Sequence, residues 1–494
     1  MFKIGFDNEK YLSMQSERIR NRIKQFGGKL YLEFGGKLFD DYHASRVLPG
    51  FLPDSKIKML SQLKDQAEII VVINAEDIEK NKTRGDLGIT YDQDVLRLID
   101  IFRGFGFMVG SVVITRYREQ CPAEMFKERL ESLGLKVYRH YTIPGYPSEL
   151  STIVSDDGFG RNDYIETSRS LIVVTAPGPG SGKMATCLSQ LYNDYKRGIS
   201  SGYAKYETFP IWNLPLRHPV NLAYEAATAD LADVNMIDPF HFEAYNEVTV
   251  NYNRDVEIFP VLNAMFERIY GESPYKSPTD MGVNMAGNCI TDDEAVSKAA
   301  KDEIIRRYYT AMCNKRRGLS DGNDAMKIEL IMKRAGISPD QRAVTVAALR
   351  KEQETGEPAA AIELPDGRIV TGKTTELLGA TSAALLNALK LLGGIEDSAH
   401  LIPPSFIQPV QALKTGHLGS QNPRLHTDEI LVALSISASA DPRAQIAMDQ
   451  LDKLKSCDAH STVILSSVDS SVMSKLGVNM TCEPKYETGK LYHK

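Results

Sequence analysis

The first third of the chain alternates short, almost wholly apolar runs with amphipathic stretches. The apolar runs are rich in Val and Ile, and they predict strands at Lys29–Phe34, Glu68–Asn74, Val109–Thr115, Lys136–His140 and Ser170–Thr175. Strands that are apolar nearly throughout are typical of a parallel sheet that is covered on both faces. The intervening patterns at Asp54–Gln66, Asp92–Gly104 and Pro122–Leu133 predict helices. Strand–helix alternation indicates a Rossmann-like α/β domain over residues 1–209.

Residues 210–356 have mostly helical spacing. Pro219 and Pro260 predict helix starts at Val220–Val234 and Val261–Tyr270. Asp292–Arg317 has the clearest apolar periodicity, and Thr291 with Glu294 forms a possible capping box. Acidic residues are favoured in the first turn of a helix because of the helix dipole. We therefore interpret the acidic cluster at its start as part of a helix N-terminus and not as a set of metal ligands. We therefore expect a mainly helical middle domain.

The last part, residues 357–494, contains both helical and strand-like patterns of apolar residues, and it predicts a second α/β or α+β domain. Asp366-Gly367 marks a hairpin turn, and an apolar helix follows at Ser382–Leu392. The pattern then predicts strands at Ile430–Ser437 and Ser461–Ser466, with a helix at Pro442–Lys455 between them. The stretch Leu401–Thr427 is rich in Pro and Gly. It predicts a long loop, and long ordered loops are often functional.

Composition narrows the class of protein. The chain has 494 residues, 43% of them hydrophobic, and a net charge of −6. It is long enough to bury a core without disulfides, and the charge gives no reason to expect nucleic acid or an acidic membrane as a partner. Six cysteines occur without CxxC spacing, the charged N-terminus does not resemble a signal peptide, and no apolar run reaches the length of a membrane span. We expect a cytoplasmic protein.

The strand at Ser170–Thr175 runs into a Gly/Pro loop, a lysine and an amphipathic helix. This layout resembles a P-loop, in which backbone N–H groups, a helix N-terminus and a lysine bind phosphate. The predicted phosphate-binding residues of the loop are Gly178, Gly180, Ser181, Gly182 and Lys183. Pro177 replaces the first glycine of the G-x-x-x-x-G-K-[ST] pattern, and Met184 replaces the hydroxyl that binds magnesium. The motif therefore favours phosphate binding over ATP hydrolysis. A structural Gly-rich turn with an exposed lysine is the alternative.

Basic residues follow other predicted strands at the same edge of the sheet. Lys37 comes after the first strand, and Arg116 and Arg118 come after the third. Ligands of open parallel sheets bind at the carboxyl ends of the strands, so these residues and Lys183 predict a site for a small anionic ligand. Solvated surface charges are the alternative for any one of them.

The histidines give weaker signals. His43, His417 and His426 are possible acid–base groups, although a structural role is favoured for each. The sequence contains no HExxH motif and no GxSxG motif, so we predict no metal site and assign no catalytic residue.

Three strings, at residues 176–198 (APGPGSGKMATCLSQLYNDYKRG), 206–241 and 288–294 (NCITDDE), identify a resemblance that covers the whole chain. The chain resembles a bacterial family of uncharacterised cytosolic proteins, catalogued as a domain of unknown function. The resemblance implies a Rossmann-like part, a helical part and a further α/β part. It implies no catalytic residues and no cofactor. Some members have been labelled ATP-dependent zinc proteases, but this sequence lacks HExxH and has only the degenerate loop.

Three hypotheses follow from the sequence. The first is an enzyme that acts on a phosphorylated metabolite or nucleotide. The second is a non-catalytic sensor of such a ligand, and the third is an assembly protein with a structural glycine loop. The sequence identifies no cofactor, and it leaves open whether the protein forms a homo-oligomer.

Overall fold

Seven parallel strands form the main sheet, in the order β11-β8-β1-β7-β2-β5-β6. Their bounds are β1 Leu30–Phe34, β2 Ala67–Asn74, β5 Met108–Tyr117, β6 Lys136–Tyr141, β7 Leu171–Thr175, β8 Gly202–Tyr206 and β11 Gly282–Val283. Every residue of β1, β2 and β7 is buried, as the continuous apolar runs predicted. The five predicted strands are thus confirmed, and β8 and β11 extend the sheet beyond them.

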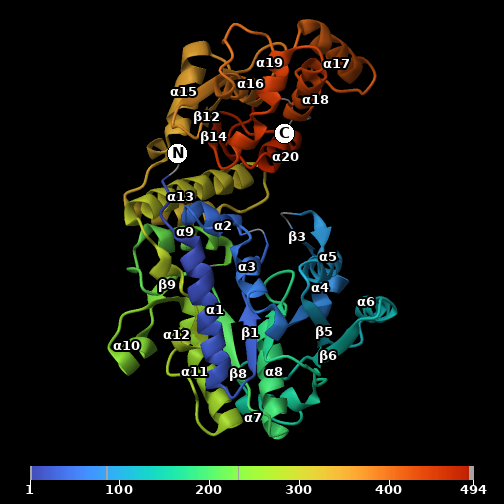
Figure 1. Ribbon diagram of the computed structural model, residues 1–494, viewed down its shortest axis with the longest axis vertical. Coiled ribbons are helices and arrows are strands. Elements are labelled where there is room, and N and C mark those ends of the chain that lie inside the picture. The colour runs from blue at the N-terminus through green and yellow to red at the C-terminus, as the bar shows by residue number, and fades with distance from the viewer. Residues whose placement is uncertain (1–2, 40, 85–86, 232, 489–494) are drawn as a thin grey trace. The chain divides into compact units, whose positions relative to one another are not determined.

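The computed structural model describes residues 3–39, 41–84, 87–231 and 233–488. The chain divides into two units (Figure 1). The N-terminal unit contains Ile4–Tyr224 and Asp233–Val296. The C-terminal unit contains Met1–Lys3, Glu225–Ala232 and Ser297–Lys494. Residues 210–356, predicted as one helical domain, are therefore shared between the two units.

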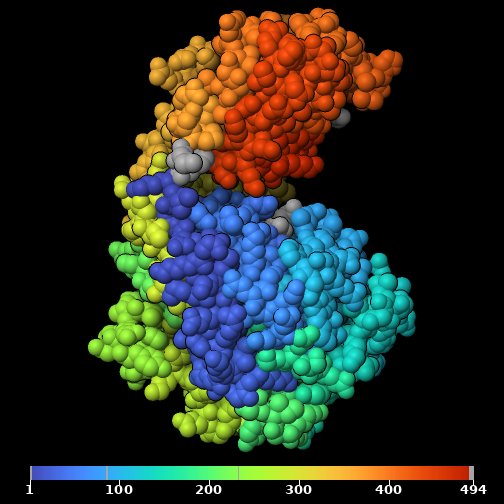
Figure 2. Space-filling view, in the orientation of Figure 1, coloured from blue at the N-terminus to red at the C-terminus, as the bar shows by residue number. Residues whose placement is uncertain are grey.

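Several helices of the N-terminal unit pack on the main sheet. The helices of this unit are α1 Asn8–Gln25, α2 Tyr42–Val47, α3 Ser55–Ser61, α4 Ala75–Glu79, α5 Tyr91–Gly104, α6 Cys121–Ser132, α7 Leu150–Ile153, α8 Lys183–Lys196, α10 Pro239–Tyr245, α11 Asn253–Tyr270 and α12 Pro278–Met281. Helix α8 packs on β1, β7 and β8, whereas α5 packs on β2 and β5. In Figure 2, α1 (dark blue) and the segments of α5 and α6 (light blue and cyan) share one face of this unit. The short pairs β3 Thr83–Arg84 with β4 Ile89–Thr90, and β9 Asn235–Ile237 with β10 Val250–Tyr252, are antiparallel.

The C-terminal unit has a mixed four-stranded sheet in the order β13-β12-β14-β15. Its strands are β12 Ala359–Glu363, β13 Ile369–Lys373, β14 Asp458–Ser461 and β15 Asn479–Cys482. The hairpin predicted at Asp366-Gly367 is confirmed, and β14 pairs with β15 in parallel. The helices of this unit are α14 Asn323–Ala335, α15 Ala343–Thr355, α16 Ala380–Leu392, α17 Pro404–Gly416, α18 Thr427–Ala438, α19 Pro442–Met448 and α20 Ser467–Lys475.

Two predictions for the C-terminal part were wrong, and a third was correct at one residue only. Residues 430–437, predicted as a strand, lie within helix α18. The predicted loop at 401–427 contains helix α17, which begins at Pro404 and has Pro409 inside it. The predicted strand at 461–466 overlaps β14 only at Ser461.

Two helix starts in the middle of the chain also differ from the prediction. Helices α9 (Pro219–Ala227) and α13 (Asp293–Arg316) are present. However, α11 begins at Asn253, and Pro260 lies inside it with its side chain exposed. The side chain of Asp292, not that of Thr291, accepts the capping hydrogen bond at the start of α13, from Ala295 N at 3.0 Å.

Over the residues that the structure describes, none of the helices is long and apolar enough to cross a membrane.

Candidate functional site

The glycine loop, residues 176–182, lies between β7 and helix α8. Gly182 precedes the helix with φ +92°, and Gly180 has φ +74°. A side chain is strained at such angles. At Gly182 a Cβ atom would also lie 3.0 Å from the Thr115 side chain. The loop therefore requires glycine at these two positions, and it leads directly into the N-terminus of a 14-residue helix.

The sheet topology places this loop at a switch point. β7 lies between β1 and β2. After β2 the chain continues to β5 and β6 at one edge, whereas after β7 it crosses to β8 on the opposite side. The connections that leave β2 and β7 therefore diverge, and in open α/β sheets a ligand crevice forms where this happens.

Side chains at the ends of neighbouring strands hold the carbonyl groups of the loop. Thr115 Oγ1 donates a hydrogen bond to Ser181 O at 2.6 Å, and Asn74 Nδ2 donates one to Gly180 O at 3.5 Å. Ser181 Oγ donates to Gly178 O at 2.7 Å. In the described part of the chain, none of the backbone N–H groups from Gly180 to Lys183 has a hydrogen-bond partner. Four donors next to a helix N-terminus are suited to an anion.

Sequence reasoning missed the residues that fix this loop. Thr115 and Asn74 end predicted strands, and Tyr91, which directly precedes a predicted helix, is the first residue of α5. A Cβ atom added to Gly178 would lie 2.3 Å from the Tyr91 hydroxyl, so the loop approaches that ring closely. The polar residues at strand ends were the available signal.

The four predicted cations differ in their surroundings. Lys183 is the first residue of α8 and is half-buried, and no described residue forms a hydrogen bond or ion pair with its side chain. Arg116 lies near the end of β5 and Arg118 directly follows it, and both contact Glu76, at 3.6 and 2.5 Å. Lys37 is exposed after β1. The two arginines thus already share a carboxylate, which leaves Lys183 as the main positive charge for the loop.

Cys187, which follows the glycine loop, does not have the features of an activated thiol. Cys187 lies one turn into α8 and is buried, and burial raises the pKa of its thiol well above the usual value. A thiol of that kind is a poor nucleophile. Within the described ranges, no group of three or more His, Cys, Asp or Glu side chains could hold a metal ion. His43 packs edge-on against Phe209, with ring centroids 5.2 Å apart.

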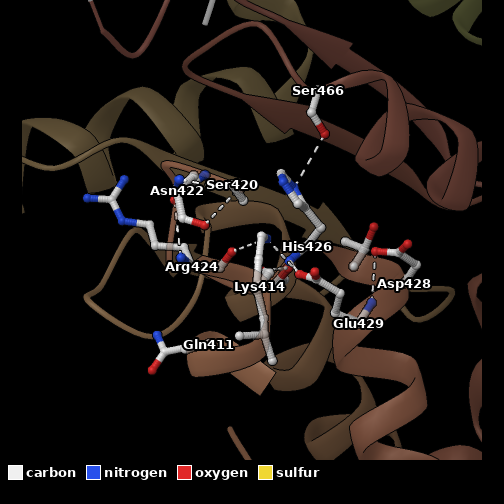
Figure 3. Close-up of polar contacts among 12 residues, drawn as sticks. Gln411, Lys414, Ser420, Asn422, Arg424, His426, Asp428, Glu429 and Ser466 are labelled. Carbon is white, nitrogen blue, oxygen red and sulfur yellow. Dashed lines mark hydrogen bonds and ion pairs between the residues drawn. The ribbon is translucent and has the colours of Figure 1, made fainter. Parts of the chain in front are cut away.

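A second polar cluster lies in the C-terminal unit, around His426 (Figure 3). His426 Nδ1 lies 2.9 Å from Asp469 Oδ2, and Ser466 Oγ donates to the same oxygen at 2.8 Å. Nearby, the buried Lys414 contacts Glu429 at 2.8 Å, and Figure 3 shows these two side chains pointing toward one another. Ser466 is on the Nδ1 side of the ring, together with the carboxylate, so the three residues do not form a nucleophile–base–acid relay. His417 follows α17 and is exposed.

The His426–Asp469 pair predicts a pH dependence of stability. Its hydrogen bond raises the pKa of His426 above 6.5 and lowers that of Asp469. A raised histidine pKa stabilises the fold fully below pH 6.5, and this contribution is lost as pH rises through the folded-state value. We expect the free energy of unfolding, from urea titrations followed by far-UV circular dichroism, to fall less between pH 6 and pH 9 in His426→Asn than in the wild type. An equal fall in both proteins would contradict this assignment.

Comparisons with known proteins cover both units. The model of the family described as "Domain of unknown function DUF1846, N-terminal" matches residues 4–336, and the C-terminal model of the same family matches residues 340–492. A Corynebacterium diphtheriae protein, UPF0371 protein DIP2346, is 60% identical over 492 residues, which is 99% of each chain. A Streptococcus pyogenes protein, UPF0371 protein SpyM50764, is 58% identical over the full length of both chains. The chain therefore belongs to the DUF1846 family.

Proposed function

We propose that the N-terminal unit binds a small phosphorylated metabolite or nucleotide through its phosphate group at the glycine loop. The observation that carries the proposal is the set of N–H groups from Gly180 to Lys183, which lack partners among the described residues while the neighbouring carbonyls are tied back by Thr115 and Asn74. Phosphate oxygens would accept hydrogen bonds from these N–H groups, and the partial positive charge of the α8 N-terminus would add to the charge of Lys183.

The surroundings of the loop favour binding over ordinary NTP hydrolysis. The first residue after Lys183 is Met184, which has no hydroxyl for magnesium, and β2 ends in Asn74 rather than Asp. P-loop NTPases use both of these groups to hold the metal. Three further basic residues could bind additional negative charges of a larger ligand. They are Lys37 and the two arginines that pair with Glu76, Arg116 and Arg118.

Thermal unfolding with added phosphate compounds tests this proposal. A ligand that binds only the native state at 100 times its Kd stabilises by about 2.7 kcal/mol, and that raises the melting temperature by several degrees. We expect this from at least one of inorganic phosphate, ribose 5-phosphate and adenosine monophosphate. We expect the Lys183→Ala variant to lose most of the shift, because it lacks the half-buried cation.

Lys196→Ala provides a matched control. Lys196 is at the other end of the same helix and pairs with Asp156. The control should keep the full ligand-induced shift. The proposal fails if no phosphate compound stabilises the wild type, or if the two lysine variants respond equally.

A further inference from the structure

A small cavity lies beside the carboxyl end of β8, within the N-terminal unit. Its volume is about 20 Å³, and its lining includes Lys205, Glu207, Trp212, Asn251, Thr279 and Asn284. A space of this size holds one water-sized group. The cavity therefore suits a single hydroxyl or carbonyl oxygen rather than a whole ligand.

Two carboxylates share one lysine at this cavity. Lys205 Nζ lies 2.6 Å from Glu207 Oε1 and also pairs with Asp255 of α11. The three side chains are only 11–18% exposed, so ionisation of both carboxyls would place one net negative charge away from water. Burial, the largest cause, raises the pKa of Glu207 to about 7. The other titratable groups that face it are Tyr252, which donates to Glu207 Oε1, and Tyr224.

Two residues that line the cavity each have a polar side-chain atom that forms no hydrogen bond with a described residue. Oε2 of Glu207 and Nδ2 of Asn251 have no hydrogen-bond partner in the described part of the chain. Neither is among the buried side-chain atoms that are closed off without a partner, so both are accessible. The two residues that carry these atoms both line the cavity.

The strand register relates this cavity to the glycine loop. Glu33 of β1 is paired with Val174 of β7 on one side and with Lys205 of β8 on the other. Because neighbouring strands lie about 4.8 Å apart, the carboxyl ends of β7 and β8 are about 10 Å apart. The charge of Glu33 also acts on both Cys187 of α8 and Lys205. A ligand that occupies both places must therefore span at least this distance, as an extended nucleotide can.

We propose that Glu207 is the general acid–base group for an oxygen at the non-phosphorylated end of the ligand, with Asn251 orienting that oxygen. This inference rests on the proposed phosphate binding at the glycine loop. In the acid direction, the O–H bond of the Glu207 carboxyl breaks as an O–H bond to a ligand carbonyl or alkoxide oxygen forms. The carboxylate that results stays beside Lys205. In the base direction, the same proton returns from a ligand hydroxyl.

Trp212 makes the cavity observable, because it is the single tryptophan of the chain and lines the cavity with Glu207. We expect the tryptophan emission of the wild type to titrate with a midpoint near pH 7. Glu207→Gln should abolish the transition, and Glu207→Asp should move its midpoint. Glu257→Gln, which changes an exposed carboxylate on α11, should leave it unchanged. Circular dichroism checks that each variant is folded.

Adding ligands to the wild type distinguishes a failure of this inference from a failure of the proposed function. Adenosine monophosphate should raise the melting temperature and change the Trp212 emission, whereas inorganic phosphate should raise the melting temperature alone. If no titration occurs between pH 5 and pH 9, or if it persists in Glu207→Gln, the acid–base assignment is overturned. If phosphate stabilises through Lys183 but no organic phosphate changes the emission, the cavity role fails and phosphate binding stands. If no phosphate compound stabilises the protein at all, the proposed function fails, and this inference fails with it.

Discussion

Replacing Arg342 with alanine is expected to destabilise the C-terminal unit by about 3–5 kcal/mol, as the loss of a buried charged partner typically does. Arg342 is 2% exposed and directly precedes α15. Its guanidinium donates to Ala459 O at 3.0 Å, to Asn479 O at 2.8 Å and to Asp458 Oδ1 at 2.8 Å. One side chain thus holds β14 and β15 to the start of a helix, and its removal takes the charged partner from the half-buried Asp458 carboxylate.

Urea titration followed by far-UV circular dichroism measures this effect. Trp212 lies in the N-terminal unit, so its fluorescence follows the other unit separately. We expect Arg342→Ala to shift the circular dichroism transition and leave the fluorescence transition in place. Arg368→Ala removes an exposed arginine that pairs with Asp366, and it should change neither. Equal stability of Arg342→Ala and Arg368→Ala would show that the buried network contributes little.

The second large effect is expected at Asp194, near the end of α8. Its side chain is fully buried and accepts hydrogen bonds from Tyr31 Oη at 2.9 Å and Tyr164 Oη at 2.8 Å. It also pairs with Lys29 Nζ at 2.9 Å. Asp194→Ala leaves a lysine and two hydroxyls without their shared acceptor, so we expect a loss of about 3–5 kcal/mol.

The Trp212 unfolding transition in urea should report this loss, because Asp194 lies in the same unit as Trp212. Asp156→Ala is the matched control, since Asp156 is exposed and pairs with Lys196 of the same helix. A shift in Asp156→Ala as large as that in Asp194→Ala would contradict the role of burial. Because Asp194 anchors the helix whose first residue is Lys183, weaker phosphate stabilisation in Asp194→Ala would link the anchor to the loop.

The main sheet could be predicted from the sequence because its central strands are buried on both faces. Strands such as β2 and β7 are continuous apolar runs, which few other structures require. The same signal was misleading at residues 430–437. There the apolar run lies on helix α18, whose first turn contains Asp428 and Glu429, and Glu429 accepts a hydrogen bond from His426 N at 2.7 Å. Length and capping, rather than hydrophobicity, distinguish the two cases.

The glycine loop could also be located from the sequence. The residues that pair with the basic side chains near the loop could not be. The pairing of Arg116 and Arg118 with Glu76 depends on β2 and β5 being adjacent, and this is decided by the sheet order. The cavity beside Glu207 draws its lining from residues 205–284, across β8, β10, α12 and β11. No local pattern marks side chains that meet only after folding.

The late position of the edge strand β11 in the chain has a consequence for the synthesis of the protein. β11, the last strand of the main sheet, is at Gly282–Val283, whereas β1 begins at Leu30. A ribosome adds about 5–20 residues per second, so β8 waits several seconds for the strand that covers its outer edge. During that interval an exposed strand edge can pair with another chain. We therefore expect nascent chains that stop before β11 to need chaperones more than the finished protein does.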